Sequence, residues 1–354
     1  MKLNQLEVFQ ATVLHKSHDE FLFYANFTPD LEIRVRDKLG IDKDIDLREY
    51  FEMYSPVQVN MKPPVNNTEP DFSKYFSDIK IPVGGYINSL GVLELPGSMY
   101  HFTSYVSPLR NATNLDEIEK FPYPSVDNYS EDHMAEQVRS AHKSGKVTCC
   151  NLTHMYEDAW QIRGYTQFLM DMIIQPENCE FILDRIYDRN LRRAEAAARA
   201  GVDVLITGDD VANQRTLMFS PNDWRRFIKS RWAKVYDAAR RIKPDIQIWY
   251  HSDGDIEQII PELIEIGVTI LNPIQPECMD PIEIKRKYGK HLVLDGMIGT
   301  QSIMPFGKPE DIKNLIIDYK KKIGYDGALM FSPTHVLEPE VPLENVLSFI
   351  TECK

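Results

Sequence analysis

The chain has 354 residues, 43% hydrophobic and 26% charged, so it can bury a core and is neither disordered nor membrane-like. Fifty-three acidic against forty basic residues give a net charge of −13, which would repel a nucleic-acid backbone. The five cysteines lack the density of a disulfide scaffold and the CxxC spacing of a zinc finger, and the N-terminus shows no apolar leader. We therefore expect a cytoplasmic globular protein without a nucleic-acid or membrane partner.

The first 145 residues contain two strand candidates, EFLFYANF at 20–27 and PVQVNM at 56–61. Prolines interrupt the remainder of this stretch, among them Pro63, Pro82 and Pro122. Because proline favours turns and loops, we expect an N-terminal extension made of loops and a small lid rather than a second domain.

From about residue 145 onward, a short apolar run alternates with a longer helical pattern. Runs that are apolar throughout, rather than alternating, indicate a parallel sheet buried on both faces. The six runs are KVTCCNLT (146–153), VDVLITGDD (202–210), IQIWYHSDG (246–254), GVTILNPIQ (267–275), HLVLDGMIG (291–299) and GALMFSPTH (327–335).

Several of the intervening helices carry start and stop signals. Ser220 and Pro221 open one segment, and Asp280 and Pro281 open another that Gly289 ends. Pro309 and Gly324 bracket a third helix, and Asp255 is placed to cap a fourth that ends before Gly267.

Six βα units plus the two N-terminal strands predict one (β/α)8 TIM-type barrel with an N-terminal extension, a single domain over residues 1–354. A doubly wound open sheet is the alternative. In such barrels the chemistry lies where the strands end, and the residues there are unusually polar. They are Asn151 and His154; Asp209, Asp210 and Gln214; Tyr250, His251, Ser252 and Asp253; Asn272, Gln275, Glu277 and Cys278; Asp295, Thr300 and Gln301; and Ser332, Thr334 and His335.

His251, Asp253 and His335 form a candidate three-ligand set for zinc or another divalent metal. His251 and Asp253 are separated by one residue just past a strand, and barrel closure could bring His335 across the mouth. The alternative is structural: two buried, hydrogen-bonded histidines and an aspartate that caps the following helix.

Asp209 and Asp210 are consecutive carboxylates after VLITG, and two ionised carboxylates this close repel each other. We expect at least one at the mouth as a general base or a partner of a metal-bound histidine, with Tyr250 as a further catalytic candidate. The alternative is that either aspartate is solvated or caps the next turn. The candidate substrate-binding residues are Asn151, Gln275 and Gln301.

The segments YHSDGDIEQIIPELIEIGVTILNPIQPECMDPIEIKRKYGKHLVLDGMIGTQSIMPFG and GALMFSPTHVLEPEVPLENVLSFI resemble the uroporphyrinogen decarboxylase superfamily. They are most similar to its branch of cobalamin-dependent methyltransferases, and GVDVLITGDDVANQRTLMFSPNDWRRFIKSRW extends the resemblance upstream. The family fold is a (β/α)8 barrel. FLFYANFTPDLEIRV lacks the arginine-rich RQAGR motif of the true decarboxylases, so the resemblance disfavours porphyrin decarboxylation.

Methyltransferases of this branch that serve thiol acceptors hold zinc through an HxC motif and a later cysteine. Here His251 matches the histidine, Asp253 replaces the first cysteine, and His335 falls at or near the second. This harder ligand set leaves a metal more Lewis acidic. The resemblance thus implies a corrinoid-dependent methyltransferase with a divalent metal, zinc favoured, that demethylates a methyl ether or a methylamine.

No cobalamin-binding domain is recognisable in the sequence, so we expect the corrinoid on a partner protein, and a homodimer is a further expectation. Two other classes stay open. One is a lyase that uses Asp209 or Asp210 as acid/base on a carboxylated substrate, and the other is a non-catalytic binding relative.

Overall fold

The computed structural model describes residues 3–66, 70–97 and 103–354. Its main sheet has eight parallel strands in the order β1-β11-β10-β9-β8-β7-β6-β2. The sheet ends approach each other because the Tyr54 N–H, just before β2, donates to the Phe23 carbonyl of β1 at 2.7 Å. The bounds are β1 Leu22–Phe23, β2 Val57–Gln58, β6 Thr148–Asn151, β7 Val204–Gly208, β8 Gln247–His251, β9 Ile270–Asn272, β10 Val293–Asp295 and β11 Leu329–Phe331.

This strand order confirms the predicted (β/α)8 barrel, because neighbours in the wall follow one another in the chain. The doubly wound alternative is wrong, since that fold reverses its strand order at a switch point. Each of the eight predicted strand segments contains one of the barrel strands.

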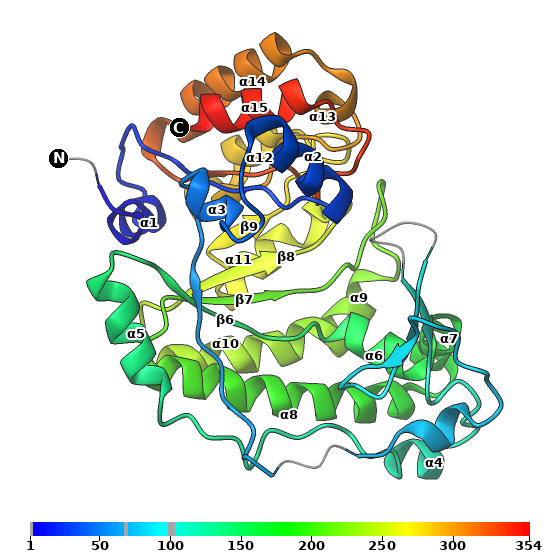
Figure 1. Ribbon diagram of the computed structural model, residues 1–354. Helices are drawn as coiled ribbons and strands as arrows, with labels where there is room; N and C mark the ends of the chain where they lie inside the picture. The colour runs from blue at the N-terminus through cyan, green and yellow to red at the C-terminus, as the bar shows by residue number, and fades with distance from the viewer. Residues whose placement is uncertain (1–2, 67–69, 98–102) are drawn as a thin grey trace.

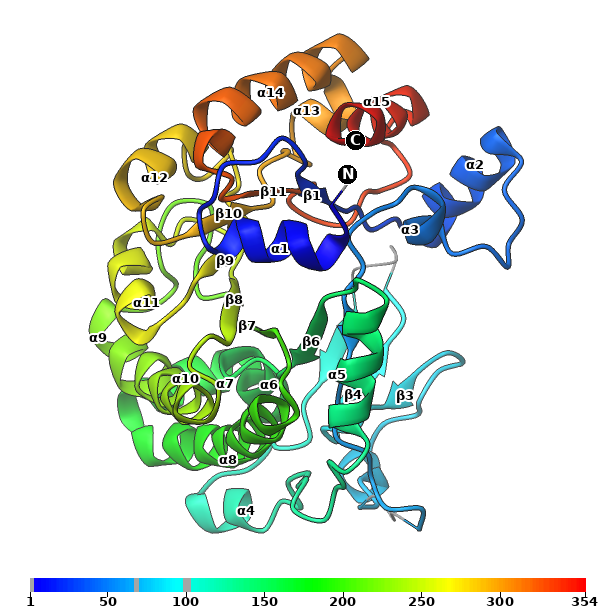
Figure 2. The same ribbon diagram turned by 90° about the vertical axis from the view of Figure 1, so that its left-hand side faces the viewer.

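Helices surround the strands (Figure 1), and α8, α10, α11, α12 and α14 form an arc on one side of the barrel in Figure 2. None of the described helices combines the length and the apolar character that a bilayer span requires. The bounds are α1 Gln5–Val13, α2 Pro29–Leu39, α3 Leu47–Tyr50, α4 Leu115–Glu119, α5 Met134–Lys143, α6 Tyr156–Arg163, α7 Tyr165–Ile174, α8 Pro176–Ala200, α9 Pro221–Trp224, α10 Ser230–Ile242, α11 Ile260–Ile266, α12 Pro281–Tyr288, α13 Ile303–Phe306, α14 Pro309–Lys322 and α15 Leu343–Cys353.

The predicted helix signals act largely as expected. The Asp280 carboxylate accepts from the Ile282 N–H at 2.8 Å, and Pro281 is the first residue of α12. Asp255 differs, because its carboxylate accepts from the Glu257 N–H at 3.1 Å, at the start of a short 3-10 helix that precedes α11, and not from a residue of α11 itself.

The N-terminal extension, expected to consist of loops and a small lid, also contains regular structure. It contains a three-stranded antiparallel sheet in the order β3-β4-β5 in addition to its loops. These strands are two or three residues long, too short to give a recognisable alternation of polar and apolar residues. Their bounds are β3 Tyr86–Ile87, β4 Leu93–Leu95 and β5 Ser104–Val106.

The barrel interior is apolar toward the N-terminal ends of the strands. Inward-facing residues such as Val204, Ile270 and Val293 form one buried cluster with Val8 and Phe9 of α1. Helix α1 therefore closes this end of the barrel, across which it lies in Figure 2.

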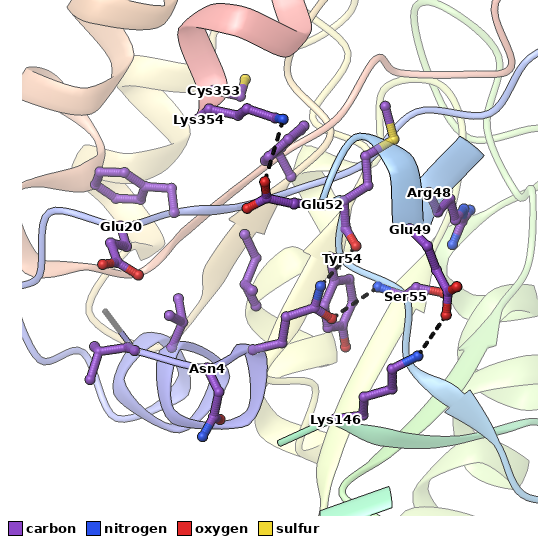
Figure 3. Close-up of a pocket in the computed structure, with 17 residues that line it drawn as sticks. Asn4, Glu20, Arg48, Glu49, Glu52, Tyr54, Ser55, Lys146, Cys353 and Lys354 are labelled. Carbon is purple, nitrogen blue, oxygen red and sulfur yellow. Dashed lines mark hydrogen bonds and ion pairs between the residues drawn. The ribbon is translucent and has the colours of Figure 1, made fainter. Parts of the chain in front are cut away.

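A cavity of about 380 Å³ lies at this closed end, between α1, β1, α3 and the C-terminus (Figure 3). Its polar groups largely pair with each other: the Gln5 amide donates to the Met53 carbonyl at 2.8 Å, and Lys146 lies 3.0 Å from Glu49. In TIM-type barrels this end serves stability, so we look for the functional site at the opposite end.

Candidate functional site

Polar side chains line the open end of the barrel, where they lie beyond the apolar interior layer at the C-terminal ends of the strands. Side chains alternate along a strand, and the partly buried Trp249 packs against the interior cluster, so His251 also faces inward. The same alternation turns Asn272 inward after Ile270 and Asp295 inward after Val293. The ends of β8, β9 and β10 thus deliver an imidazole, an amide and a carboxylate to one place.

Asp210, His251 and Asp253 form the group suited to metal binding. One ligand atom from each lies within 4.8 Å of those of the other two, the single such group among the described residues. His251 Nε2 lies 3.6 Å from Asp210 Oδ1, which also accepts from the Asp253 N–H at 2.8 Å. The His251 and Asp210 side chains are 23% and 37% exposed, so the group opens to solvent at the mouth.

The electrostatics of this group fit a cation. Asp253 Oδ1 is buried and accepts no hydrogen bond from the described residues. Burial raises the pKa of Asp253, and the charge of Asp210 adds to this effect, although the nearby His251 opposes it. Two carboxylates that repel each other, one with an unpartnered buried oxygen, are an arrangement that a divalent metal would stabilise.

A hydrogen-bond chain fixes the orientation of His251. The Asn272 amide nitrogen donates to Asp295 Oδ2 at 3.0 Å, which leaves Asn272 Oδ1 facing His251 Nδ1 at 2.8 Å. Because this amide oxygen can only accept, Nδ1 carries the proton. In the neutral ring the lone pair is then on Nε2, which lies on the side of Asp210 and is the atom that could bind a metal.

Asp295 anchors this chain from the barrel interior. It is fully buried and accepts from the Tyr24 hydroxyl and the Trp249 indole N–H at 2.9 Å each, and from Ser332 at 3.2 Å. Burial raises the pKa of Asp295 to about 6, and these hydrogen bonds limit the rise. The imidazole of His251 also stacks on Trp249, with ring centroids 5.8 Å apart.

A second histidine lies beside the first. The His154 ring is 6.3 Å from that of His251, and its Nδ1 bonds to Glu157 of α6. Burial opposes protonation of His154, but the hydrogen bond and charge of Glu157 outweigh it and raise its pKa to about 10. Near neutral pH His154 is therefore protonated and forms an ion pair with Glu157, a pair without net charge.

The two consecutive aspartates have different surroundings. Asp209 is fully buried and accepts from the Trp232 indole N–H and the Tyr156 backbone N–H at 2.6 Å each. Burial raises the pKa of Asp209 to about 8. Asp209 is therefore neither solvated nor a cap of the turn that follows β7, because its oxygens bind α6 and α10. Asp210 lies beside His251, where at least one of the pair was expected.

Tyr250, the other catalytic candidate, is fully buried. It alternates with the inward-facing Trp249 and His251, so it points toward the helices rather than the mouth. This position disfavours contact of its hydroxyl with a substrate.

The three substrate-binding candidates lie at different depths. Asn151 is exposed, and alternation with the interior Cys149 turns it inward. Gln275 is buried and accepts from the Gly254 N–H at 2.6 Å, so it holds the loop that carries Asp253. Gln301 is exposed and accepts from the Gln214 amide at 2.7 Å.

His335 lies outside the group of three potential ligands. It is an exposed residue after β11, and its charge lowers the pKa of Asp253, which places it on the same side of the barrel. Asp210 occupies the third position that the sequence assigned to His335. Metal ligation by His335 stays a prediction.

Two important residues had no assigned role in the sequence interpretation. Asn272 and Asp295 stand among the strand-end polar residues, but nothing in their spacing reveals that they meet each other and His251. Glu157 also had no assigned role; the available signal was its position three residues after His154, in the first turn of the helix that begins at Tyr156.

Comparisons with known proteins place this chain in a family. A methyltransferase from Methanosarcina mazei shares the fold: it is 17% identical, with 99% of this chain and 98% of that chain covered and a TM-score of 0.67. A B12-independent methionine synthase from Shewanella sp. W3-18-1 is 11% identical over 62% of this chain and 64% of that one, with a TM-score of only 0.40, too low to carry an argument. No curated protein matches the sequence. The family model of uroporphyrinogen decarboxylase (URO-D) matches residues 151–354, more than half of the chain, and the protein therefore belongs to this family.

Proposed function

We propose that this protein is a methyltransferase that moves a methyl group between a small molecule and a corrinoid carried by a separate protein, assisted by a divalent metal. The observation that carries the proposal is the group of Asp210, His251 and Asp253, with its imidazole nitrogen and its unpartnered buried carboxylate oxygen. The methyltransferase fold neighbour and the sequence resemblance support the same reaction class.

The residues fit a metal of intermediate hardness, such as zinc, because they offer one imidazole and two carboxylates and no thiolate. Asp210, His251 and Asp253 would hold it, and His335 is our candidate for an additional ligand. A bound cation would polarise the oxygen or nitrogen that carries the methyl group and so stabilise the departing anion. This suits a methyl ether, our preferred donor, or a methylamine.

The remaining contributions come from the chain itself. Asn272 and Asp295 hold His251 in one tautomer, so no reorganisation of the ring is needed when it binds a ligand. The imidazole of His154, held by Glu157, lies beside that of His251 with ring centroids 6.3 Å apart, so it is a candidate hydrogen-bond donor to a leaving group at the mouth. Trp249 stacks against His251 and keeps water from one face of the ring.

Methyl transfer can be tested with free cob(I)alamin in place of the corrinoid protein. The zinc-loaded protein is incubated with a panel of methyl ethers and methylamines, and methylcobalamin formation is followed by absorbance. Asp253→Asn and His251→Ala should reduce the rate by about 10²-fold or more. Asp237→Asn, which removes an exposed charge on α10, is the control and should leave the rate unchanged.

A lyase is the alternative, and the burial of Asp209 leaves Asp210 as its candidate acid/base. Activity on a carboxylated substrate such as uroporphyrinogen, with no methyl transfer to cob(I)alamin from any donor, would replace the methyltransferase proposal. Loss of methyl transfer in Asp237→Asn to the same degree as in Asp253→Asn would also contradict it.

A further inference from the structure

A second cavity, of about 480 Å³, lies beside the mouth of the barrel. Its walls come from α8, from the segments that follow β2 and β6, from the turn between β3 and β4, and from the segment before α5. Thr153 in its wall directly precedes His154 of the site described above. The lining residues that matter below are Asn88, Glu94, Tyr129, Arg189 and Arg193.

Arg193 in this cavity differs from the other arginines of α8. Each of the others has a carboxylate partner, whereas Arg193 has none among the described residues. Its guanidinium instead donates to the backbone carbonyl of Asn151. The pairs are Arg185 with Asp188, Arg189 with Asp158, Arg192 with Glu131, and Arg199 with Glu131 and Glu195.

The surroundings of Arg193 make an unpaired guanidinium costly. Burial lowers the pKa of Arg193, and the positive charge of Arg189 acts in the same direction. Asp158 of α6 also acts on Arg193 by its charge, but its carboxylate is already bonded to Arg189 at 2.8 Å. Arg193 thus borders a cavity without a carboxylate in direct contact with its guanidinium, and an anionic ligand there would supply one.

The opposite wall restricts the charge of that ligand. Glu94 lines the cavity, and its two oxygens accept from the Tyr86 hydroxyl at 2.7 Å and the Asn88 amide at 2.8 Å. Its hydrogen bonds are satisfied, but its negative charge remains and would repel a dianion more strongly than a monoanion. A planar carboxylate also matches the fork of a guanidinium, which can bind it through two N–H groups.

We infer that this cavity binds the carboxylate group of a small molecule, with Arg193 as its ion-pair partner and Tyr129 as a neighbouring hydroxyl donor. The inference is independent of methyl transfer, because it rests on the charges and hydrogen bonds of this cavity and not on Asp210, His251 or Asp253.

We would test this inference by calorimetric titration of the full chain with sodium benzoate and sodium acetate. The ionic strength is kept constant, and chloride and phosphate serve as comparison anions. Both carboxylates should bind, and Arg193→Gln should weaken this binding by about tenfold or more. Arg192→Gln is the matched control, since Arg192 is the adjacent residue and pairs with Glu131; it should bind as the wild type does.

Three results would overturn the inference. The carboxylates could bind no more tightly than chloride, phosphate could bind more tightly than either carboxylate, or Arg192→Gln could lose as much carboxylate affinity as Arg193→Gln. If Arg193→Gln does not fold, Arg193→Lys serves instead, because lysine keeps the charge but loses the two-pronged geometry. It should then bind benzoate measurably more weakly than the wild type, and unchanged affinity would count against Arg193 as the partner. The titration needs neither metal nor corrinoid, so its failure is distinct from failure of methyl transfer.

Discussion

Replacing Asn272 by leucine tests how the site prepares His251. The change keeps the side-chain volume but removes the acceptor 2.8 Å from His251 Nδ1 and the donor 3.0 Å from Asp295 Oδ2. Asp295 keeps its bonds to Tyr24 and Trp249, so the main loss is the partner of the imidazole N–H. Leaving such a buried donor unsatisfied costs about 1–3 kcal/mol.

The larger expected effect is on metal binding, because the proton of His251 is no longer held on Nδ1. Loss of such an orienting partner lowers metal affinity by about 10- to 100-fold. Absorption titration with Co²⁺ measures the affinity, and ¹⁵N NMR of the imidazole reports its tautomer without any metal. The metal-free wild type should show the proton on Nδ1.

Asn345→Leu is the matched control. Asn345 is also buried and donates two hydrogen bonds, to the Met304 and Gly307 carbonyls at 2.9 and 2.8 Å, but it lies on α15 away from His251. It should lower the free energy of unfolding by a similar amount and leave Co²⁺ affinity unchanged. A wild-type proton on Nε2, or equal Co²⁺ affinity in Asn272→Leu and the wild type, would refute the role given to Asn272.

Further predictions concern the same end of the barrel. The pKa of Asp295 is raised to about 6 from about 4 in the unfolded chain, so its stabilising contribution is full below pH 4 and is lost as the pH rises to about 6. The difference in unfolding free energy between the wild type and Asp295→Asn, measured by urea denaturation, should fall over this range, and a constant difference would count against the assignment. Asp210→Asn should weaken Co²⁺ binding more than His335→Ala does; the reverse order would restore His335 as the third ligand. Gly208→Ala should lower the unfolding free energy by about 1–3 kcal/mol in the same denaturation experiment, because a Cβ there would lie 2.5 Å from the His251 carbonyl oxygen; unchanged stability would show that β8 yields without strain.

The sequence predicted the fold better than the site. Apolar runs and helix caps are local signals, and they were enough to find every barrel strand and the barrel itself. The strand-end rule also identified His251, Asp253 and Asp210 as residues of the mouth. This rule could not show that Asp210 lies closer than His335 to His251 and Asp253, because the distances between strand ends depend on the tilt and closure of the barrel.

Side-chain direction explains the other differences. Asp209 and Tyr250 are each adjacent in the chain to residues of the mouth, yet alternation along a strand turns them toward the helices. The chain from Asp295 through Asn272 to His251 joins three strands, so no spacing within one segment reveals it. The small sheet of β3, β4 and β5 was not predicted, because its strands are too short to show an alternation of polar and apolar residues.

The central claim is that Asp210, His251 and Asp253 hold the metal that assists methyl transfer. Anomalous diffraction at the zinc edge, from crystals of protein loaded with one equivalent of zinc, tests it most directly. We predict a single peak within bonding distance of all three side chains, about 2.0–2.2 Å from a histidine nitrogen and from carboxylate oxygens. A peak that excludes His251 or Asp253, or no peak at the mouth of the barrel, would contradict the claim.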